Sequence, residues 1–352
     1  MAQGIYQRGG STINPSKPSV DLRPDSINEL ARSFWHSAIL RAGIKLNLFS
    51  FLEGNALTYN DVAQRIGAAP RFVQAFLESC VVLDLLEKRE DTYSNSPLAS
   101  KFLVKGGKEY IGDHALHHTN TWASWGRLDE VIREGKTLLP YETGYVDAAT
   151  YWTDYMMGQH NRAASGQARY LVESVDLRSR RKLLDLGGGA ASYSIALCGA
   201  NPQLKAVVVD SKEPLEIARP LVDEHHLRGQ ITLLEGDFLQ TKLGTDYDVA
   251  LISGVVLIKS EEDSRCLFKA AYDALLPGGM VIVQDYMRID HSPERVRLDT
   301  LEHMYVMVAF DPGAADREGE EVASWLRDTG FQNLKMIPLP TQLALITAEK
   351  SV

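Results

Sequence analysis

Three acidic residues stand directly after apolar, β-prone runs in the second half of the chain. Asp185 precedes the glycine loop Gly187–Gly189, Asp210 ends the run VVVD, and Asp237 lies in EGDF. A helix cap or a solvated loop would account for one such acid. Three acids at successive strand ends instead predict a bound ligand that needs hydrogen-bond acceptors and, at Asp185, a partner for positive charge.

The type of ligand follows from the charge of Asp185. The glycine loop alone is also typical of dinucleotide enzymes, but a carboxylate just ahead of it would repel a pyrophosphate. S-adenosylmethionine has no phosphate and carries a sulfonium and an ammonium group, which suit Asp185. Asp210 can then accept the ribose hydroxyls, Asp237 can accept the adenine amino group, and Phe238 can cover the adenine ring. The residues therefore predict S-adenosyl-L-methionine as the cofactor and S-adenosyl-L-homocysteine as its product.

A parallel sheet is needed to bring these acids together. Between residues 179 and 352 apolar strands alternate with helices, beginning with KLLDL, SYSIALCGA and LKAVVVD. Repeated βα units predict an α/β fold with a Rossmann-like, doubly wound sheet, in which the ends of parallel strands share one edge. The last two runs, NLKMIPLP and TQLALITAEK, predict an antiparallel edge hairpin. We expect residues 179–352 to form the cofactor-binding domain.

The first half of the chain is helical and is organised differently. Residues 1–22 are rich in Gly, Ser and Pro and predict a disordered lead-in. Residues 23–105 predict a helix to about Gly43, helices over 58–66 and 70–83, and a hairpin, which is the order of a winged helix. The helix over 70–83, which would be the recognition helix of a DNA-binding winged helix, has one Arg and a wide apolar face. We therefore expect subunit pairing rather than DNA binding. Residues 106–178 predict linking helices that cover the substrate.

Composition excludes several kinds of partner. The 352 residues carry a net charge of -9, which opposes docking on nucleic acid. No apolar run is long enough to span a membrane, and the N-terminus lacks the apolar stretch of a secretory signal. Cys80, Cys198 and Cys266 are far apart and lie in apolar segments, which predicts buried thiols in a soluble, cytoplasmic protein.

The motifs DLGGG, VVVD and EGDF, a PGG before a strand, and the winged-helix unit together resemble a known family. It is the family of two-domain O-methyltransferases that includes the plant caffeic acid and animal acetylserotonin methyltransferases. The resemblance covers the chain from about residue 25 and implies an intertwined homodimer that methylates a small molecule. The cofactor contacts that it implies are Gly187, Gly189, Asp210, Asp237 and Phe238. To these we add Asp185 and Ser253, which end the first and fourth strands.

One position departs from the family pattern. After the fourth strand the family has Asn-x-x-His-x-Trp, in which the His is the general base that deprotonates a hydroxyl. Here the segment reads SGVVLIKS, and Leu257 stands at the position of the base. Leucine cannot accept a proton. The acids that orient the family His correspond to Asp285 and Asp316.

Methyl transfer from a sulfonium needs a base only if the acceptor atom must lose a proton. Three alternatives remain: a neutral acceptor such as a thioether, an activated carbon, or another side chain in place of the His. The candidate catalytic residues are His160, Tyr286, Asp285 and Asp316, with His303, Tyr141 and Tyr145 as further candidates for the base. The predicted substrate contacts are Tyr141, Tyr145, Arg162, Leu257 and His303. Arg162 would clamp a carboxylate if it faces inward.

Family members without the His include a bacteriochlorophyll carbon methyltransferase and the S-methyltransferases of dimethylsulfoniopropionate synthesis, which methylate a methylthio-hydroxybutyrate. The missing base therefore favours a thioether sulfur or a carbon as acceptor. Two other classes stay open: a member that uses the bound cofactor as a fixed cation without transferring methyl, and a winged-helix regulator that binds DNA. The spacing of His114, His117 and His118 could hold a metal, but no second ligand set accompanies them, and we predict none.

Overall fold

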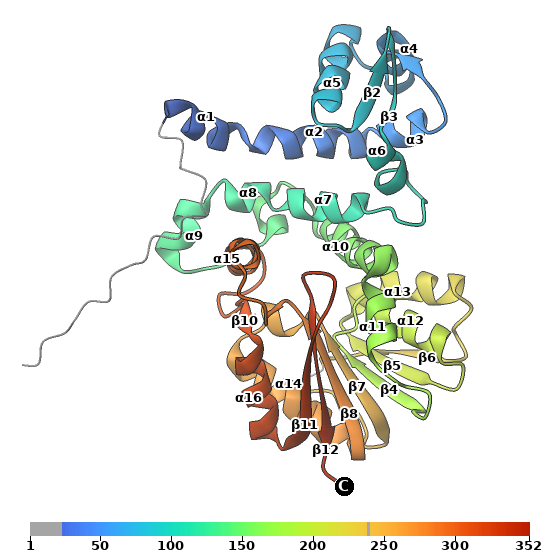
Figure 1. Ribbon diagram of the computed structural model, residues 1–352, viewed down its shortest axis with the longest axis vertical. Helices are drawn as coiled ribbons and strands as arrows, with labels where there is room; N and C mark the ends of the chain where they lie inside the picture. Colours follow the sequence, from blue (N-terminus) through green and yellow to red (C-terminus); the bar gives the residue numbers. More distant parts are fainter. Residues whose placement is uncertain (1–22, 238–239) are drawn as a thin grey trace, which may run out of the picture.

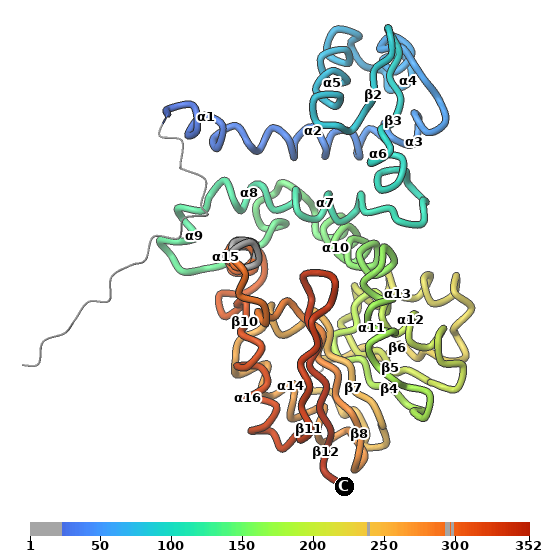
Figure 2. Tube along the Cα trace, in the orientation of Figure 1, coloured from blue at the N-terminus to red at the C-terminus, as the bar shows by residue number. Residues whose placement is uncertain are grey.

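The computed structural model describes residues 23–237 and 240–352. The predicted lead-in over residues 1–22 and the predicted adenine contact Phe238 both lie outside the described residues. Figure 1 shows a small N-terminal unit, a layer of helices beneath it, and a large sheet with helices on both faces. The chain passes through these three parts in that order, as the trace in Figure 2 shows.

The large sheet has seven strands in the order β11-β12-β8-β7-β4-β5-β6. Their bounds are β4 Lys182–Leu186, β5 Lys205–Asp210, β6 Ile231–Glu235, β7 Tyr247–Ser253, β8 Leu275–Asp285, β11 Phe331–Pro338 and β12 Ala344–Lys350. Strands β6, β5, β4, β7 and β8 are parallel, whereas β12 runs antiparallel to both β8 and β11. The predicted doubly wound sheet with an antiparallel edge hairpin is therefore confirmed.

Alternating side chains bury both faces of this sheet. In β4, Leu183 packs into one apolar cluster, while Leu184 and Leu186 pack into another. The helices on the first face are α11 Ala168–Ser174, α12 Ser192–Ala200 and α13 Lys212–Glu224, and those on the second are α14 Glu261–Ala274 and α16 Gly319–Thr329. A strand that is apolar at every position is typical of a sheet covered on both sides.

The N-terminal unit has its own core. Its elements are α3 Leu48–Leu52, β1 Leu57–Thr58, α4 Tyr59–Ile66, α5 Pro70–Val82, β2 Leu86–Arg89, β3 Thr92–Asn95 and α6 Pro97–Phe102. The predicted hairpin is β2 and β3, and β1 adds a third short strand to it. Before this unit, the predicted single helix is divided into α1 Pro24–Arg32 and α2 Phe34–Lys45. The division lies at Ser33, whose hydroxyl donates to the Leu30 carbonyl.

A layer of linking helices covers the edge of the sheet where the parallel strands end (Figure 1). It contains α7 Gly112–Asn120, α8 Trp122–Trp125, α9 Leu128–Glu134, the short helix η1 Pro140–Thr143, α10 Ala148–Arg162 and η2 Ala163–Gln167, and α15 Pro293–Ala309 lies against it. Helices α7 and α10 approach closely because position 158 is Gly: a Cβ there would lie 2.9 Å from the His114 Cα. Helix α7 is also tied to α2, since Arg41 donates to the Thr119 hydroxyl at 2.6 Å.

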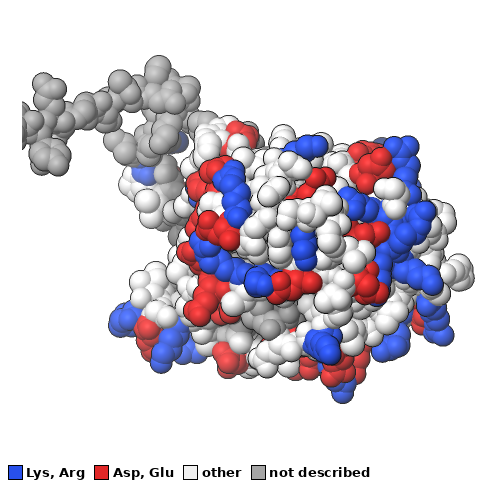
Figure 3. Space-filling view, turned by 90° about the horizontal axis from the view of Figure 1, so that it is seen from below, with Lys and Arg blue, Asp and Glu red and all other residues white. Residues whose placement is uncertain are grey.

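The surface carries charges of both signs. The face drawn in Figure 3 shows Lys and Arg interspersed with Asp and Glu and no broad patch of one sign. Among the described residues, no helix is long and apolar enough to cross a membrane. Cys80 and Cys198 are buried as predicted, but the prediction for Cys266 is wrong. Cys266 is exposed because it lies on the outer side of α14, away from the sheet.

Candidate active site

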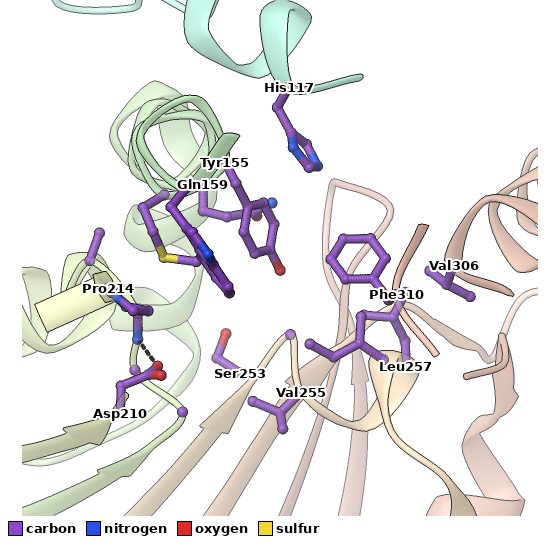
Figure 4. A pocket seen from close by; sticks show the side chains of 18 of the residues that line it. His117, Tyr155, Gln159, Asp210, Pro214, Ser253, Val255, Leu257, Val306 and Phe310 are labelled. Carbon is purple, nitrogen blue, oxygen red and sulfur yellow. Dashed lines mark hydrogen bonds between the residues drawn. The ribbon is translucent and has the colours of Figure 1, made fainter. Parts of the chain in front are cut away.

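A cavity of about 590 Å³ lies where the parallel strands end beneath the linking helices. Its lower wall comes from residues that follow β4, β5 and β7, and its upper wall comes from α7, α10 and α15. Figure 4 shows the two ends: Asp210 and Pro214 lie on one side, whereas His117, Phe310 and Val306 lie on the other. We call these the Asp210 end and the His117 end.

The glycine loop after β4 forms the floor of the Asp210 end. Its middle residue must be Gly, because a Cβ at Gly188 would lie 2.6 Å from the Val208 side chain and 2.7 Å from the Asp185 carboxyl group. Asp210 accepts hydrogen bonds from the backbone N–H of Gly189 at 2.8 Å and of Ser211 at 2.7 Å. The loop is thus held to the end of β5, with backbone and carboxylate groups lining the cavity.

Asp185 is buried at the centre of this floor, with 1% of its surface exposed. One carboxyl oxygen accepts the Ser194 hydroxyl at 2.6 Å, and the other has no hydrogen-bond partner among the described residues. Burial raises the pKa of Asp185 to about 7, against the lowering effect of the Ser194 hydrogen bond. A buried oxygen that lacks a partner is the kind of group that a cationic ligand completes. This unpartnered carboxyl oxygen therefore fits the positively charged ammonium and sulfonium groups of S-adenosylmethionine.

Aromatic rings wall the His117 end. Tyr151 stacks on Tyr155 with ring centroids 6.0 Å apart, and Tyr155 lies 5.4 Å from Phe310. Trp152 and Tyr305 also line the cavity. Such a chamber excludes water and offers ring faces to a small ligand.

Three histidines of α7 line the same end. His117 Nε2 lies 2.6 Å from the Tyr305 hydroxyl, and His114 Nε2 lies 3.1 Å from His118 Nε2. Burial lowers the pKa of all three rings, that of His118 to about 4. They are therefore neutral at physiological pH. No group of three or more His, Cys, Asp or Glu side chains in the described part of the chain is arranged to hold a metal ion.

Most of the predicted site residues line this single cavity. Of the residues predicted to contact the cofactor, the cavity lining includes Asp185, Gly187, Gly189, Asp210, Asp237 and Ser253. Of those predicted for catalysis or for the acceptor, it includes Tyr141, Arg162, Leu257 and Tyr286. The α7 histidines and Tyr305 also line the cavity, and the sequence motifs predicted no acceptor role for them. Their helical spacing was visible, but the contact that joins His117 to Tyr305 links residues 188 positions apart.

The structure places two candidate catalytic residues behind the cavity wall. His160 turns toward α12, where its Nδ1 lies 3.0 Å from the Ser192 hydroxyl. Asp285 is fully buried and accepts the backbone N–H groups of Val256 at 2.8 Å and Tyr286 at 2.9 Å. Neither residue lines the cavity, so neither is placed to touch an acceptor.

Three other predicted residues are absent from the cavity wall. Asp316 pairs with Arg288 at 2.9 Å, and its backbone N–H donates to His303 Nδ1 at 3.3 Å. Tyr145 is 44% exposed and stacks beside Arg41. The cavity lining includes none of Asp316, His303 and Tyr145.

Leu257 lies on the short helix η3 Val256–Ile258, directly after β7. The carboxylate of Asp285 caps this turn through the Val256 N–H. The Leu257 side chain is 5% exposed and forms part of the cavity wall beside Phe310 (Figure 4). An apolar group therefore occupies the position at which the resemblance places the general base.

Comparison with known proteins assigns the family. The family model of the O-methyltransferase domain matches residues 125–332, and that of the O-methyltransferase dimerisation domain matches residues 28–105. The fold, the cavity and these matches define a methyltransferase. The chain belongs to the O-methyltransferase family, as the sequence predicts, and the prediction of S-adenosylmethionine as cofactor is confirmed.

Relatives in the genus Streptomyces carry different activities. A tetracenomycin polyketide synthesis 8-O-methyl transferase of Streptomyces glaucescens is 29% identical over 89% of this chain and 92% of its own length. An N,N-dimethyltransferase of Streptomyces rimosus is 28% identical over 78% of this chain and 81% of its own length. An L-tyrosine C(3)-methyltransferase of Streptomyces lavendulae is 27% identical over 81% of this chain and 79% of its own length.

Solved structures share the fold. Human N-acetylserotonin methyltransferase in complex with SAM aligns with a TM-score of 0.83 at 22% identity, covering 97% of this chain and 100% of the human one. Both the N-terminal unit and the large sheet therefore have counterparts in that protein.

The burial of Asp185 predicts how stability depends on pH. Its folded-state pKa of about 7 exceeds the value of about 3.9 for an unfolded Asp, so between these values the folded chain holds a proton that the unfolded chain has lost. The free energy of unfolding therefore falls as pH rises through this window, by up to about 1.4 kcal/mol per pH unit from this group. We expect Asp185→Asn to gain stability relative to the wild type as pH rises, and the gain to level off above about pH 7.

Urea unfolding followed by circular dichroism at a series of pH values measures this difference. Asp273→Asn, which changes an exposed carboxylate on α14, is the matched control. A stability difference between Asp185→Asn and the wild type that stays constant with pH would contradict the raised pKa.

Proposed function

We propose that this methyltransferase transfers the methyl group of S-adenosylmethionine to a thioether sulfur of a small molecule, an acceptor atom that loses no proton. An activated carbon, from which a proton would leave after the transfer, is the second candidate. Leu257 in the cavity wall carries this proposal, because it cannot serve as a base. The nearby histidines are poor substitutes. Burial lowers the pKa of His117, and its Nε2 already contacts the Tyr305 hydroxyl.

The cofactor would bind at the Asp210 end. Asp185 would receive the positively charged end of the cofactor, Asp210 the ribose hydroxyls and Asp237 the adenine amino group, with Gly187, Gly189 and Ser253 alongside. The cavity wall that contains these residues supports this assignment. In this scheme residues 179–352 bind the cofactor, residues 106–178 cover the acceptor, and residues 23–105 pair the subunits.

When bound, the cofactor supplies a methyl group that is activated by the positive charge on its sulfur. A lone pair of the acceptor sulfur forms the new bond, the old carbon–sulfur bond breaks toward the cofactor, and the positive charge ends on the acceptor. No proton is released. The rings of Tyr151, Tyr155 and Phe310 can face the new cation. The neutral histidines add no positive charge that would repel it.

Family membership by itself leaves the acceptor atom open. The three relatives methylate oxygen, nitrogen and carbon according to their names. The preference for sulfur rests instead on Leu257 and on the aromatic rings that wall the His117 end. A member that holds the cofactor only as a fixed cation would form no S-adenosylhomocysteine, so detection of that product separates methyl transfer from the alternative.

Removal of the Asp210 carboxylate is expected to weaken cofactor binding. Asp210→Ala loses a charged hydrogen-bond acceptor, worth about 1.5 to 3 kcal/mol, which corresponds to an increase in Kd of about 10-fold to 150-fold. Calorimetric titration with S-adenosylhomocysteine measures the change. An unchanged Kd would show that Asp210 does not contact the ligand.

Restoration of the family base is expected to leave the native reaction unimproved. Leu257→His introduces a proton acceptor, but a thioether has no proton to lose, so kcat on the native acceptor should not rise. Leu257→Met, which keeps an apolar side chain of similar volume, controls for the change in packing. A rise in kcat of tenfold or more with His and not with Met would refute the neutral-acceptor proposal.

We also propose a homodimer, in accordance with the matched dimerisation domain. The apolar side chains of α1 and the start of α2 are exposed in one chain, at 69% for Ile27, 72% for Leu30, 59% for Phe34 and 51% for Trp35. Helix α1 buries none of its residues and extends beyond the N-terminal unit (Figure 1). An exposed apolar stripe of this kind is typical of a subunit interface.

Light scattering coupled to gel filtration tests this assembly. The wild type is expected at twice the chain mass of 39.1 kDa. Leu30→Asp places an unpaired charge in the proposed interface at a cost of about 2 kcal/mol or more, and this raises the dimer Kd by about 30-fold or more. The control is Leu276→Asp, at an apolar residue that is 43% exposed near the start of β8. A monomeric wild type, or a Leu30→Asp dimer as tight as the control, would contradict the proposal.

A further inference from the structure

Arg162 is a positively charged side chain inside the cavity. It is the last residue of α10, is half-buried, and lines the cavity wall. Its guanidinium stacks over the Tyr286 ring with 4.9 Å between the group and the ring centroid. Its hydrogen bond to Gln159 is long, at 3.4 Å. Among the side chains that the structure describes, no carboxylate forms an ion pair with it.

Two carboxyl groups near Arg162, both in the described part of the chain, form no ion pair with it. Burial raises the pKa of Glu302, which lines the same wall, and the charge of Arg162 opposes this shift. Burial also raises the pKa of Asp285, to about 7. Arg162 and Lys259 are the two lining residues with a fixed positive charge. Burial raises the pKa of Asp210, and Lys259 opposes this shift, which places the Lys259 charge toward the Asp210 end. Arg162 is therefore the residue that brings a fixed positive charge to the acceptor part of the cavity.

The half-buried guanidinium of Arg162 forms no ion pair that would offset its partial removal from water. Withdrawal of a charge from water is unfavourable unless a counter-charge or several hydrogen bonds replace the water. Stacking on Tyr286 fixes the plane of the guanidinium but supplies no negative charge. A planar guanidinium held in this way matches a carboxylate through two parallel hydrogen bonds.

We propose that Arg162 binds the carboxylate of the methyl acceptor, so that the substrate is a small carboxylic acid whose other end reaches the cofactor's methyl group. This inference rests on the proposed function, because it assigns an acceptor to the His117 end. Arg162 acts on the pKa of cavity-lining groups on α7 and α15, namely His118, Tyr305 and Glu302. It also acts on the pKa of Tyr193, which follows the glycine loop on α12.

The cofactor itself contains a carboxylate, in its methionine portion, and this is the competing source of the same chemistry. Two titrations separate the sources. In the first, S-adenosylhomocysteine is titrated into the dimer. In the second, 4-(methylthio)butanoate and its amide are titrated into the protein saturated with S-adenosylhomocysteine. Binding is measured without methyl transfer, so the result stands even if the thioether is not methylated.

The wild type is expected to bind the acid at least tenfold more tightly than the amide. Arg162→Gln should abolish this preference and change the Kd of S-adenosylhomocysteine by less than twofold. The matched control is Arg169→Gln, which removes an exposed Arg from α11 and should preserve the preference. The acid–amide comparison in the wild type needs no variant, so the proposal stays testable if Arg162→Gln fails to fold.

Two results would overturn the proposal. Equal binding of acid and amide by the wild type would mean that no carboxylate site exists at the His117 end. A large loss of S-adenosylhomocysteine affinity in Arg162→Gln with an intact acid preference would assign Arg162 to the cofactor's carboxylate. Failure of the proposed thioether chemistry would instead appear as tight binding of the acid with no methyl transfer.

Discussion

Burial of carboxyl groups at the ends of parallel strands is the constraint on which the site depends. Asp185 is the penultimate residue of β4, and Asp285 is the last residue of β8. Both are almost fully buried between the helical layers. Burial raises the pKa of each to about 7. Each is held by a local donor, the Ser194 hydroxyl in one case and the Val256 N–H in the other. The apolar packing of the sheet thus keeps two polar groups out of water, and their partners shape the cavity floor.

The two carboxyl groups differ in what they leave unsatisfied. One oxygen of Asp285 caps the turn that carries Leu257, through the Val256 N–H, and the other accepts the Tyr286 N–H. Asp285 therefore acts on the shape of the wall and does not line the cavity. Asp185 keeps one oxygen without a partner and lines the cavity. Similar burial therefore produces a positioning residue at one strand end and a group ready for a cationic ligand at the other. The linking helices complete the site by replacing water with aromatic rings.

The sequence predicted the sheet because strands buried on both faces and their intervening helices leave a regular local pattern. It also predicted that Asp185, Asp210 and Asp237 line one cavity, since the ends of parallel strands share one edge. It failed for Asp285 and Asp316, which do not line the cavity. The acceptor end was less predictable. Whether a helical residue faces inward depends on helix packing, as His160 and Arg162 illustrate: they are two positions apart on α10, and only Arg162 lines the cavity. Helix and loop packing likewise decides that Tyr145 and Cys266 are exposed, although the sequence predicted Tyr145 in the site and Cys266 in the core.

The pH dependence of methyl transfer tests the central claim, that the reaction needs no general base. The measurement is kcat for transfer of labelled methyl to a thioether carboxylic acid at saturating cofactor and acceptor, between about pH 6 and about pH 9. We expect a nearly flat profile, because no proton leaves the acceptor. A kcat that falls about tenfold per pH unit below an apparent pKa near neutrality would show that a titrating side chain takes up a proton, and it would contradict the account.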